Sequence, residues 1–339
     1  MSLQLKKYNI LSTFQLHRDA LELFHPSEYN VVQYNKSDSV INESEFMELL
    51  QANEYHGIIC TLTTTISPDI YNIINTYQHN KCKIISTMSV GYDHIDIPGA
   101  TKNNILIGYT PNVLNDTVAD TVIALCLITG RKILPAIQSV QNGTWASWQP
   151  LNYCGIDLHH STVGIIGLGR IALAVIQRLR AFKCNIIYTG RSRKLDIEQQ
   201  YNVRFVELTE LVSTSDFVIP QCSLNDSTRH MFNSALFQLM KPTACFINTT
   251  RGGIVDEYDL YVALRDNIIG GAGLDVAECE PLRTDHPLLS LSNCIILPHI
   301  GSASVRTRID MMKLASTNVI NALNNTTKDG QYVNIDHIK

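Results

Sequence analysis

The segment STVGIIGLGRIA, residues 161–172, constrains the fold of this chain most, because it joins a short apolar run to a helical pattern. Gly167, Gly169 and Ala172 within it have G-x-G-x-x-A spacing. In such a turn the first glycine bends the chain and the second lets backbone approach a pyrophosphate, while the small third residue lets the helix pack on the strand. Another apolar run at 185–189 completes a βαβ unit. The sequence therefore predicts a dinucleotide site at the N-terminus of the helix.

The composition limits the class of protein. The chain has 339 residues, which is enough for two domains, and a hydrophobic content of 45% is enough for large cores. Its net charge is −4 and it has no polybasic run, so we expect no nucleic-acid partner. Nine cysteines occur without C-x-x-C pairs or His/Cys clusters, which favours reduced thiols and no metal site.

No targeting or membrane segment is evident. Residues 1–7 lack the apolar stretch of a signal peptide, and the longest apolar run, 122–128, is too short to cross a bilayer. We therefore expect a cytoplasmic protein with no membrane partner.

The first third of the chain alternates short apolar runs with amphipathic segments. Strands are predicted at 8–12, 31–34, 57–60, 83–86 and 105–108, and helices at 43–52 and 68–77. Short buried strands separated by helices are typical of a parallel, doubly wound sheet.

A second series of strands begins at the glycine-rich segment. Six strands are predicted, at 162–167, 185–189, 217–220, 245–248, 269–275 and 294–298, and they would complete a Rossmann sheet. Before this series, Asn115 or Asp116 can cap a long helix at 117–129, and after it a helix at 304–323 needs a surface to cover.

The predicted fold class is therefore α/β, with two doubly wound parallel-sheet domains. A Rossmann cofactor domain, 113–304, is inserted into a flavodoxin-like substrate domain made of 1–112 and 305–339. We expect the last helix to return to the first sheet and the ligand to bind in a cleft between the domains.

Three polar residues follow predicted strands of the second series: Arg251, Glu280 and His299. Ligands bind at the carboxyl ends of parallel strands, so these side chains are candidates for a catalytic site. Alone, His299 would be better explained as a capping or core histidine. Glu278 is a rival for the carboxylate role, and His286 lies in what reads as a structural turn.

The chain resembles the D-isomer-specific 2-hydroxyacid dehydrogenases over about residues 83–323. The motifs that carry the resemblance are GLGRIA (167–172), NTTRG (248–252), GLDV (273–276), EP (280–281), HPL (286–288) and PHIGS (298–302). Segments 86–93, 109–111 and 145–148 are most similar to the branch of the family that reduces glyoxylate and hydroxypyruvate.

The resemblance implies roles that suit the chemistry of the three polar residues. His299 would donate a proton to the developing alkoxide, because histidine titrates near neutral pH. Glu280 would support the imidazolium. Arg251 would grip the planar 2-oxo acid with its guanidinium fork and polarise the carbonyl.

The end of the second Rossmann strand bears on the choice of cofactor. An NAD site usually has an Asp or Glu there for the ribose 2′-OH, but this chain has Gly190. The next residues, Arg191, Ser192 and Arg193, suit a 2′-phosphate, although a solvated basic loop is the alternative. We therefore expect NADP(H) to be preferred, with NAD(H) possible.

The resemblance also implies further contacts. For the dinucleotide these are Thr117, Arg170, Ile171, Cys222, Thr249 and Asp275. Asp275 would hold the nicotinamide carboxamide, with a buried helix-capping role as its alternative.

For the substrate carboxylate, the implied contacts are the backbone of Ser89, Val90 and Gly91, with a plain strand-to-helix turn as the alternative. Trp145 and Trp148 fall in the family's twofold dimer segment, and Trp148 would reach the neighbouring subunit's substrate. Alternatively, both tryptophans fill the core of their own subunit.

The predicted function is NADPH-dependent reduction of glyoxylate to glycolate and of hydroxypyruvate to D-glycerate by a homodimer. One alternative is another member of the family, of the phosphoglycerate or D-lactate type. A second alternative is a dinucleotide-sensing binding protein like the C-terminal-binding co-repressors.

Overall fold

The computed structural model describes residues 7–35, 41–77 and 81–338 and divides into two compact units. Unit 1 consists of Met1–Leu114 and Ser304–Lys339, and unit 2 is Asn115–Ala303. Each unit is built around its own parallel sheet. The predicted α/β class with two doubly wound sheets is confirmed.

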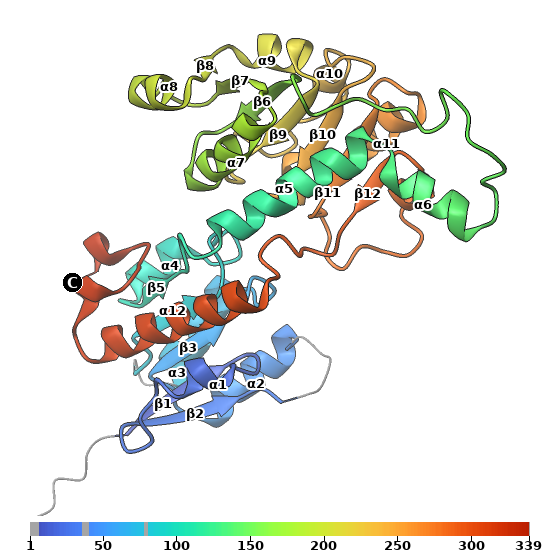
Figure 1. Ribbon diagram of the computed structural model, residues 1–339. Helices are drawn as coiled ribbons and strands as arrows, with labels where there is room; N and C mark the ends of the chain where they lie inside the picture. The colour runs from blue at the N-terminus through green and yellow to red at the C-terminus, as the bar shows by residue number, and fades with distance from the viewer. Residues whose placement is uncertain (1–6, 36–40, 78–80, 339) are drawn as a thin grey trace, which may run out of the picture. The chain divides into compact units, whose positions relative to one another are not determined.

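Unit 1 contains a five-stranded parallel sheet with the order β2-β1-β3-β4-β5 (Figure 1). The strands are β1 (Tyr8–Ser12), β2 (Tyr29–Gln33), β3 (Gly57–Cys60), β4 (Ile84–Thr87) and β5 (Leu106–Gly108). Every residue of β3, β4 and β5 is buried, because helices cover both faces of the sheet. The strand order is that of the flavodoxin-like fold.

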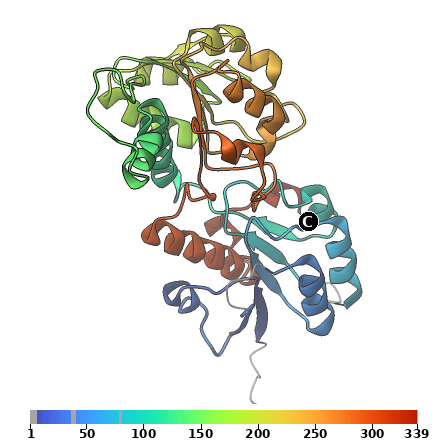
Figure 2. The same ribbon diagram turned by 90° about the vertical axis from the view of Figure 1, so that its right-hand side faces the viewer.

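The helices of unit 1 fall into two groups. On one face lie α2 (Glu43–Ala52), α3 (Pro68–Tyr77) and α4 (Ile97–Lys102), and on the other lie α1 (Arg18–Leu21) and α12 (Val305–Leu323). Figure 2 shows α12 lying along the sheet, where Val319 joins the same apolar cluster as Ile10, Ile59 and Ile84. The last long helix therefore covers the first sheet, as the sequence predicted.

Unit 2 contains a parallel sheet with the order β12-β11-β10-β9-β6-β7-β8. Its strands are β6 (Thr162–Ile166), β7 (Asn185–Thr189), β8 (Arg204–Phe205), β9 (Phe217–Pro220), β10 (Cys245–Asn248), β11 (Gly271–Leu274) and β12 (Cys294–Ile296). This is the Rossmann order with one strand added beyond the sixth. The prediction of six strands was wrong, because β8 is only two residues long and has no apolar run to signal it.

Helices cover both faces of the seven-stranded sheet. One face carries α5 (Asn115–Gly130) and α7 (Arg170–Ala181), and the other carries α9 (Leu208–Thr214), α10 (Ser234–Phe237) and α11 (Glu257–Arg265). The remaining helices are α6 (Ile133–Gln141) and α8 (Leu195–Tyr201), with short 3₁₀ turns η1 (Gly252–Ile254), η2 (Pro287–Ser290), η3 (Thr327–Asp329) and η4 (Ile335–His337).

The start of α5 differs from its prediction. The helix begins at Asn115, so Asn115 and Asp116 lie in its first turn instead of capping it. Arg178 of α7 bonds to the carboxylates of Asp116 (3.1 Å) and Asp120 (2.6 Å), which ties the two helices together. Carboxylates also suit the positive end of a helix dipole.

Within the part of the chain that the structure describes, no helix is long and apolar enough to cross a membrane. All nine cysteines are free thiols.

Candidate active site

Most candidate residues of unit 2 lie at one edge of its sheet. Because the strands are parallel, their carboxyl ends meet at that edge. Gly167 follows β6, Gly190 follows β7, Arg251 follows β10, Asp275 follows β11 and His299 follows β12. Open α/β sheets bind ligands at this edge.

The glycine-rich turn has the geometry of a phosphate cradle. Gly167 has a φ of +94°, and a Cβ there would lie 2.9 Å from the carbonyl oxygen of Gln221. A Cβ on Gly169 would meet nothing within 4 Å among the described residues, so the backbone there faces open space. Ala172 is fully buried in the apolar cluster between α7 and the sheet. The local backbone and packing at these three positions are therefore compatible with the motif.

Helix α7 begins at Arg170 and has Gly169 as its N-cap, with no side chain bonded to this end in the described structure. The first N–H groups of a helix need partners, so the backbone of Arg170 and Ile171 is well suited to an anion. Lys194 reinforces the turn by donating its Nζ to the carbonyl of Leu168 at 2.7 Å.

The two arginines of the loop after β7 differ in their side-chain contacts. Arg193 bonds through Nε (2.8 Å) and Nη2 (2.8 Å) to Glu198 of α8, which also accepts the Tyr188 hydroxyl at 2.9 Å. Hydrogen bonding from Arg193 lowers the pKa of Glu198 below its ordinary value. Arg191 and Ser192 are exposed and have no side-chain partner in the described ranges. Arg193 therefore braces the loop, while Arg191 and Ser192 remain available to a ligand.

His299 and Glu280 form a close pair. The distance from His299 Nδ1 to Glu280 Oε2 is 2.7 Å, and the two side chains are partly exposed, at 23% for His299 and 30% for Glu280. Burial alone would raise the pKa of Glu280, but the hydrogen bond and charge of His299, the N–H of Ala277 and the charge of Arg251 lower it. Glu280 is therefore held as a carboxylate that supports the imidazole.

Asp275 holds the backbone that carries His299. Its carboxylate accepts the N–H groups of Ile300 and Gly301, each at 2.7 Å, and its carbonyl accepts the N–H of His299 at 2.9 Å. His299 has a φ of 55°, in the left-handed region that needs such support. Burial raises the pKa of Asp275, although the two N–H groups and His299 oppose this. Asp275 caps no helix; it fixes the loop that presents His299.

Arg251 follows the last residues of β10 and is partly buried. Its Nη1 donates to the carbonyl of Thr250 at 3.0 Å, and its own carbonyl accepts Asn248 Nδ2 at 2.9 Å. The turn that it begins packs closely on the Glu280 loop, because a Cβ on Gly252 would lie 1.9 Å from the carbonyl carbon of Ala277. Arg251 and Glu280 thus come from two loops in direct contact.

Three other predicted cofactor residues lie in unit 2. Cys222 follows β9 and lies beside the glycine turn, because its backbone nitrogen would be 3.0 Å from a Cβ on Gly167. Thr249 follows β10 and its hydroxyl accepts Gln221 Nε2 at 3.3 Å. Thr117 lies in the first turn of α5, where its carbonyl accepts the Thr121 hydroxyl. Contact of these residues with a dinucleotide stays a prediction.

The predicted substrate loop lies in unit 1, after β4. Ser89 is buried, and its hydroxyl donates to the carbonyl of Gly91 at 2.6 Å, so it shapes the loop. The backbone N–H groups of Val90 and Gly91 donate to no group within the described residues. They are therefore free to bind an anion, as in other concave backbone sites.

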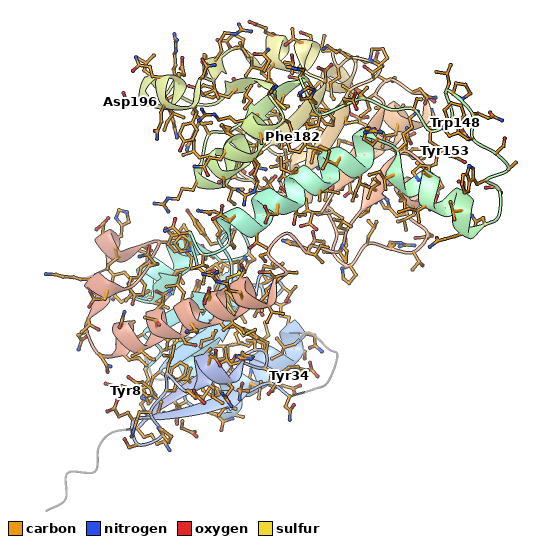
Figure 3. The ribbon with its side chains drawn as sticks, viewed as in Figure 1. Tyr8, Tyr34, Trp148, Tyr153, Phe182 and Asp196 are labelled. Carbon is orange, nitrogen blue, oxygen red and sulfur yellow. The ribbon has the colours of Figure 1, made fainter. Side chains whose placement is uncertain are left out.

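The tryptophans do not fill the core. They lie on the long loop after α6, where Figure 3 labels Trp148, and their exposed fractions are 56% for Trp145 and 78% for Trp148. Leu151 on the same loop is 83% exposed. Large exposed apolar side chains gathered on one segment are typical of an interaction surface.

Glu278 and His286, the alternative candidates from the sequence, each contact a side chain other than His299. Glu278 bonds to His230 (Oε1 to Nε2, 2.8 Å) and not to His299. His286 precedes η2 and lies 3.2 Å from Glu257, from Nε2 to Oε2. Among the described residues, no group of His, Cys, Asp or Glu side chains is arranged to hold a metal.

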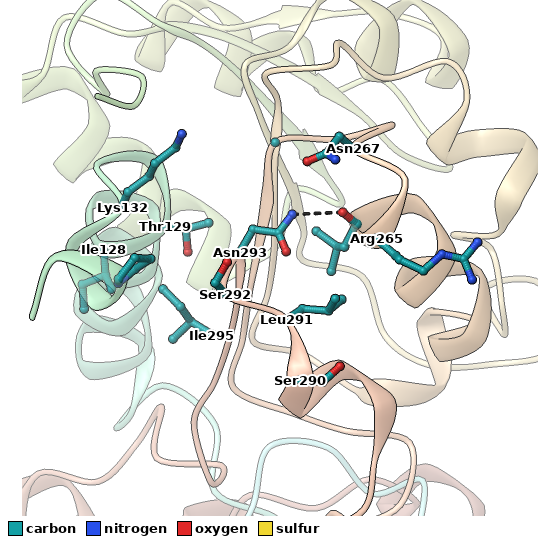
Figure 4. Close-up of a pocket in the computed structure, with 13 residues that line it drawn as sticks. Ile128, Thr129, Lys132, Arg265, Asn267, Ser290, Leu291, Ser292, Asn293 and Ile295 are labelled. Atoms are coloured by element: carbon teal, nitrogen blue, oxygen red, sulfur yellow. Dashed lines mark hydrogen bonds between the residues drawn. The ribbon is translucent and has the colours of Figure 1, made fainter. Parts of the chain in front are cut away.

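A separate hollow of about 430 Å³ lies at the opposite edge of the sheet (Figure 4). Its lining includes Thr129 at the end of α5, Asn267 after α11, and Gly270 and Asn293, which precede β11 and β12. These are the amino ends of the strands, so the hollow is distinct from the site around His299.

Two site carboxylates were not found from the sequence. Glu198 lies outside any motif, and only its place on α8 brings it to Arg193. Glu257 begins α11 and contacts the Glu280 loop. The signal for Glu257 was its nearness to Arg251 in the chain, but the sequence could not show which loop it faces.

The fold and the site define an α/β protein of the dinucleotide-binding class, in which a His–Glu pair and an arginine follow the carboxyl ends of the Rossmann strands. Residues 123–301 match the NAD-binding domain of the D-isomer specific 2-hydroxyacid dehydrogenases. The chain belongs to this family.

Similar proteins support the assignment. The glyoxylate reductase/hydroxypyruvate reductase of Homo sapiens is 43% identical over 306 residues, covering 88% of this chain and 92% of the relative. A solved protein of Thermus thermophilus is 31% identical with a TM-score of 0.87, covering 96% of this chain and 100% of its own. An NADPH-dependent glyoxylate/hydroxypyruvate reductase of Sinorhizobium meliloti, solved with NADP and malonate, is 29% identical with a TM-score of 0.79 and 97% coverage of both chains.

Proposed function

We propose that this protein reduces glyoxylate to glycolate and hydroxypyruvate to D-glycerate, using NADPH. The observation that carries the proposal is the 2.7 Å contact between His299 and Glu280, with Arg251 on the adjoining loop. The relatives named above that act on glyoxylate and hydroxypyruvate match the chain over most of its length.

In the proposed mechanism the residues of this chain bind and protonate the substrate. Arg251 grips the carboxylate and polarises the 2-oxo group, where negative charge grows. The N–H groups of Val90 and Gly91 add hydrogen bonds to the carboxylate. His299, steadied by Glu280, donates the proton to the oxygen as the alcohol forms. When it is bound, the dinucleotide would supply the hydride from its nicotinamide ring. The backbone at Arg170 and Ile171 would hold its pyrophosphate, and Asp275 would hold part of the nicotinamide.

A turnover assay tests the proposal. Purified protein is given NADPH with glyoxylate, hydroxypyruvate, pyruvate or no oxo acid, and the loss of NADPH absorbance is followed. We expect rapid turnover with the first two acids only. Faster turnover of pyruvate would instead indicate another member of the family, and no turnover with any acid would indicate a dinucleotide-sensing binding protein.

We propose that NADPH is preferred because Gly190 replaces the usual acid and Arg191 and Ser192 have free side chains. Replacing Gly190 by Asp should raise the KM for NADPH by roughly two orders of magnitude, because the new carboxylate would repel the 2′-phosphate. The KM for NADH should fall, since the carboxylate accepts the ribose 2′-OH. Steady-state kinetics with both cofactors measure the change.

Gly190→Ala is the matched control. A Cβ at this position would meet only Gly167 Cα, at 4.0 Å, so a side chain fits without strain. The alanine variant should keep the wild-type preference. If the aspartate variant also keeps it, Gly190 does not set the cofactor.

We propose that the protein is a homodimer held by the loop after α6, with Trp148 as an anchor that reaches the neighbouring subunit's substrate. The exposure of Trp145, Trp148 and Leu151 supports this. Sedimentation should give the mass of two copies, and replacing Trp148 and Leu151 by Ser should shift the protein towards one copy. A wild-type chain that sediments as one copy would contradict the proposal.

The cytoplasmic location and the absence of a nucleic-acid partner stay predictions.

A further inference from the structure

Glu280 sits on a long connection and not on a helix or strand. The chain from Asp275 to His286, between β11 and η2, forms no regular element. A catalytic side chain on such a loop needs support from outside, because a misplacement of about 1 Å can reduce the rate about 100-fold. The contact with His299 alone therefore does not fix the position of Glu280, and other residues must hold its loop.

Glu257, the first residue of α11, contacts both ends of the segment 278–286. Its Oε1 accepts the backbone N–H of Glu278 at 2.7 Å, and its Oε2 lies 3.2 Å from Nε2 of His286. The Glu257 side chain is only 13% exposed. One carboxylate thus joins the two ends of the segment in which Glu280 lies.

The peptide between Ala277 and Glu278 links this contact to the catalytic groups. The N–H of Ala277 donates to Glu280 Oε1 at 3.0 Å, and the next N–H along the chain is the one that Glu257 accepts. Gly252, directly after Arg251, packs against the same peptide, since a Cβ there would lie 2.1 Å from the nitrogen of Glu278. A shift of this peptide would therefore change the position of Glu280 relative to both His299 and Arg251.

The contact with His286 is polar, with 3.2 Å between His286 Nε2 and Glu257 Oε2. The other ring nitrogen, Nδ1, is buried and has no partner among the residues described. Without Glu257 the ring would lose this polar contact, and His286 would be stabilised by moving towards water. The loop would move with it.

We propose that Glu257 is a positioning residue that holds Glu280 against His299 through the two ends of the segment 278–286. This inference rests on the proposed function, because the effect of Glu257 is read through catalysis. It predicts that replacing Glu257 changes kcat and the pH at which Glu280 titrates, and leaves cofactor binding unchanged.

The test compares Glu257→Ala and Glu257→Gln with wild type under NADPH and glyoxylate. The alanine variant should lose about ten- to 100-fold in kcat with an unchanged KM for NADPH. Glutamine keeps an acceptor for the N–H of Glu278, so it should recover most of the loss. Asp259→Asn is the control, because it removes a carboxylate from the same first turn of α11 that bonds to Ser234 and not to the Glu280 loop.

Two further readouts separate positioning from a general loss of structure. Contact with His299 lowers the pKa of Glu280, so the acidic limb of the kcat/KM profile should move to higher pH in Glu257→Ala. In a Glu280→Gln background, the Glu257→Ala change should have little further effect on kcat, because both act through one group.

The outcomes are distinguishable. If the wild-type protein turns over no oxo acid, the proposed function fails and this inference fails with it. If the wild type is active but Glu257→Ala matches the Asp259→Asn control, the inference alone is wrong. It is also wrong if the loss in kcat is the same with or without Glu280, since Glu257 would then act on stability and not on Glu280.

Discussion

Replacing His299 by Asn should lower kcat for glyoxylate by about 10²- to 10⁴-fold, the range that a positioned proton donor contributes. Asparagine tolerates the left-handed backbone that His299 adopts at φ 55°, so the loop should keep its path. Binding of NADPH, measured by fluorescence titration, should not change. The variant therefore separates chemistry from folding and cofactor binding.

His230→Asn is a matched control for this change. His230 also has a positive φ (48°) and also pairs with a carboxylate, Glu278, at 2.8 Å. Because His230 contacts the Glu280 loop but not the His299–Glu280 pair, its variant should lose far less kcat than His299→Asn. If His299→Asn lost no more activity than His230→Asn, the proton would come from another group and the proposed mechanism would be wrong.

The second large effect is expected at Asp275. In Asp275→Asn, an NH₂ group would face the N–H of Ile300 or Gly301, and one of the two 2.7 Å hydrogen bonds would be lost. We expect the loop after His299 to shift and kcat to fall about ten- to 100-fold. Burial raises the pKa of Asp275, so removing its buried charge offsets part of the lost bonding. The melting temperature should consequently change little, although kcat falls.

Asp256→Asn controls for the loss of a carboxylate that accepts two N–H groups. Oδ1 of Asp256 accepts the N–H groups of Tyr258 and Asp259 at the start of α11, and asparagine caps a helix equally well. Its kcat should stay at the wild-type value. An Asp275→Asn variant with full activity would show that the path of the His299 loop does not depend on this carboxylate.

Much of the fold follows from local patterns in the sequence. Apolar runs such as 57–60 and 217–220 became strands at the predicted positions, because strands covered on both faces must be continuously apolar. The turn at Gly167 was predicted because few residues other than glycine adopt a φ of +94°. The two-residue strand at Arg204 gave no such signal, because its pairing with β7 depends on tertiary structure.

Local patterns were enough to predict the family, the two parallel sheets, and the edge at which Arg251, Asp275 and His299 emerge, because strand direction places successive strand ends together. The resemblance also predicted that Glu280 supports His299, and the two side chains are in contact. The partners of the other carboxylates became known only from the folded chain, where Glu278 bonds to His230, Glu198 bonds to Arg193, and Glu257 lies against the Glu280 loop. Such contacts join residues from different loops, and a hydrogen bond depends on positions to within a fraction of an ångström, which no local pattern in a sequence specifies.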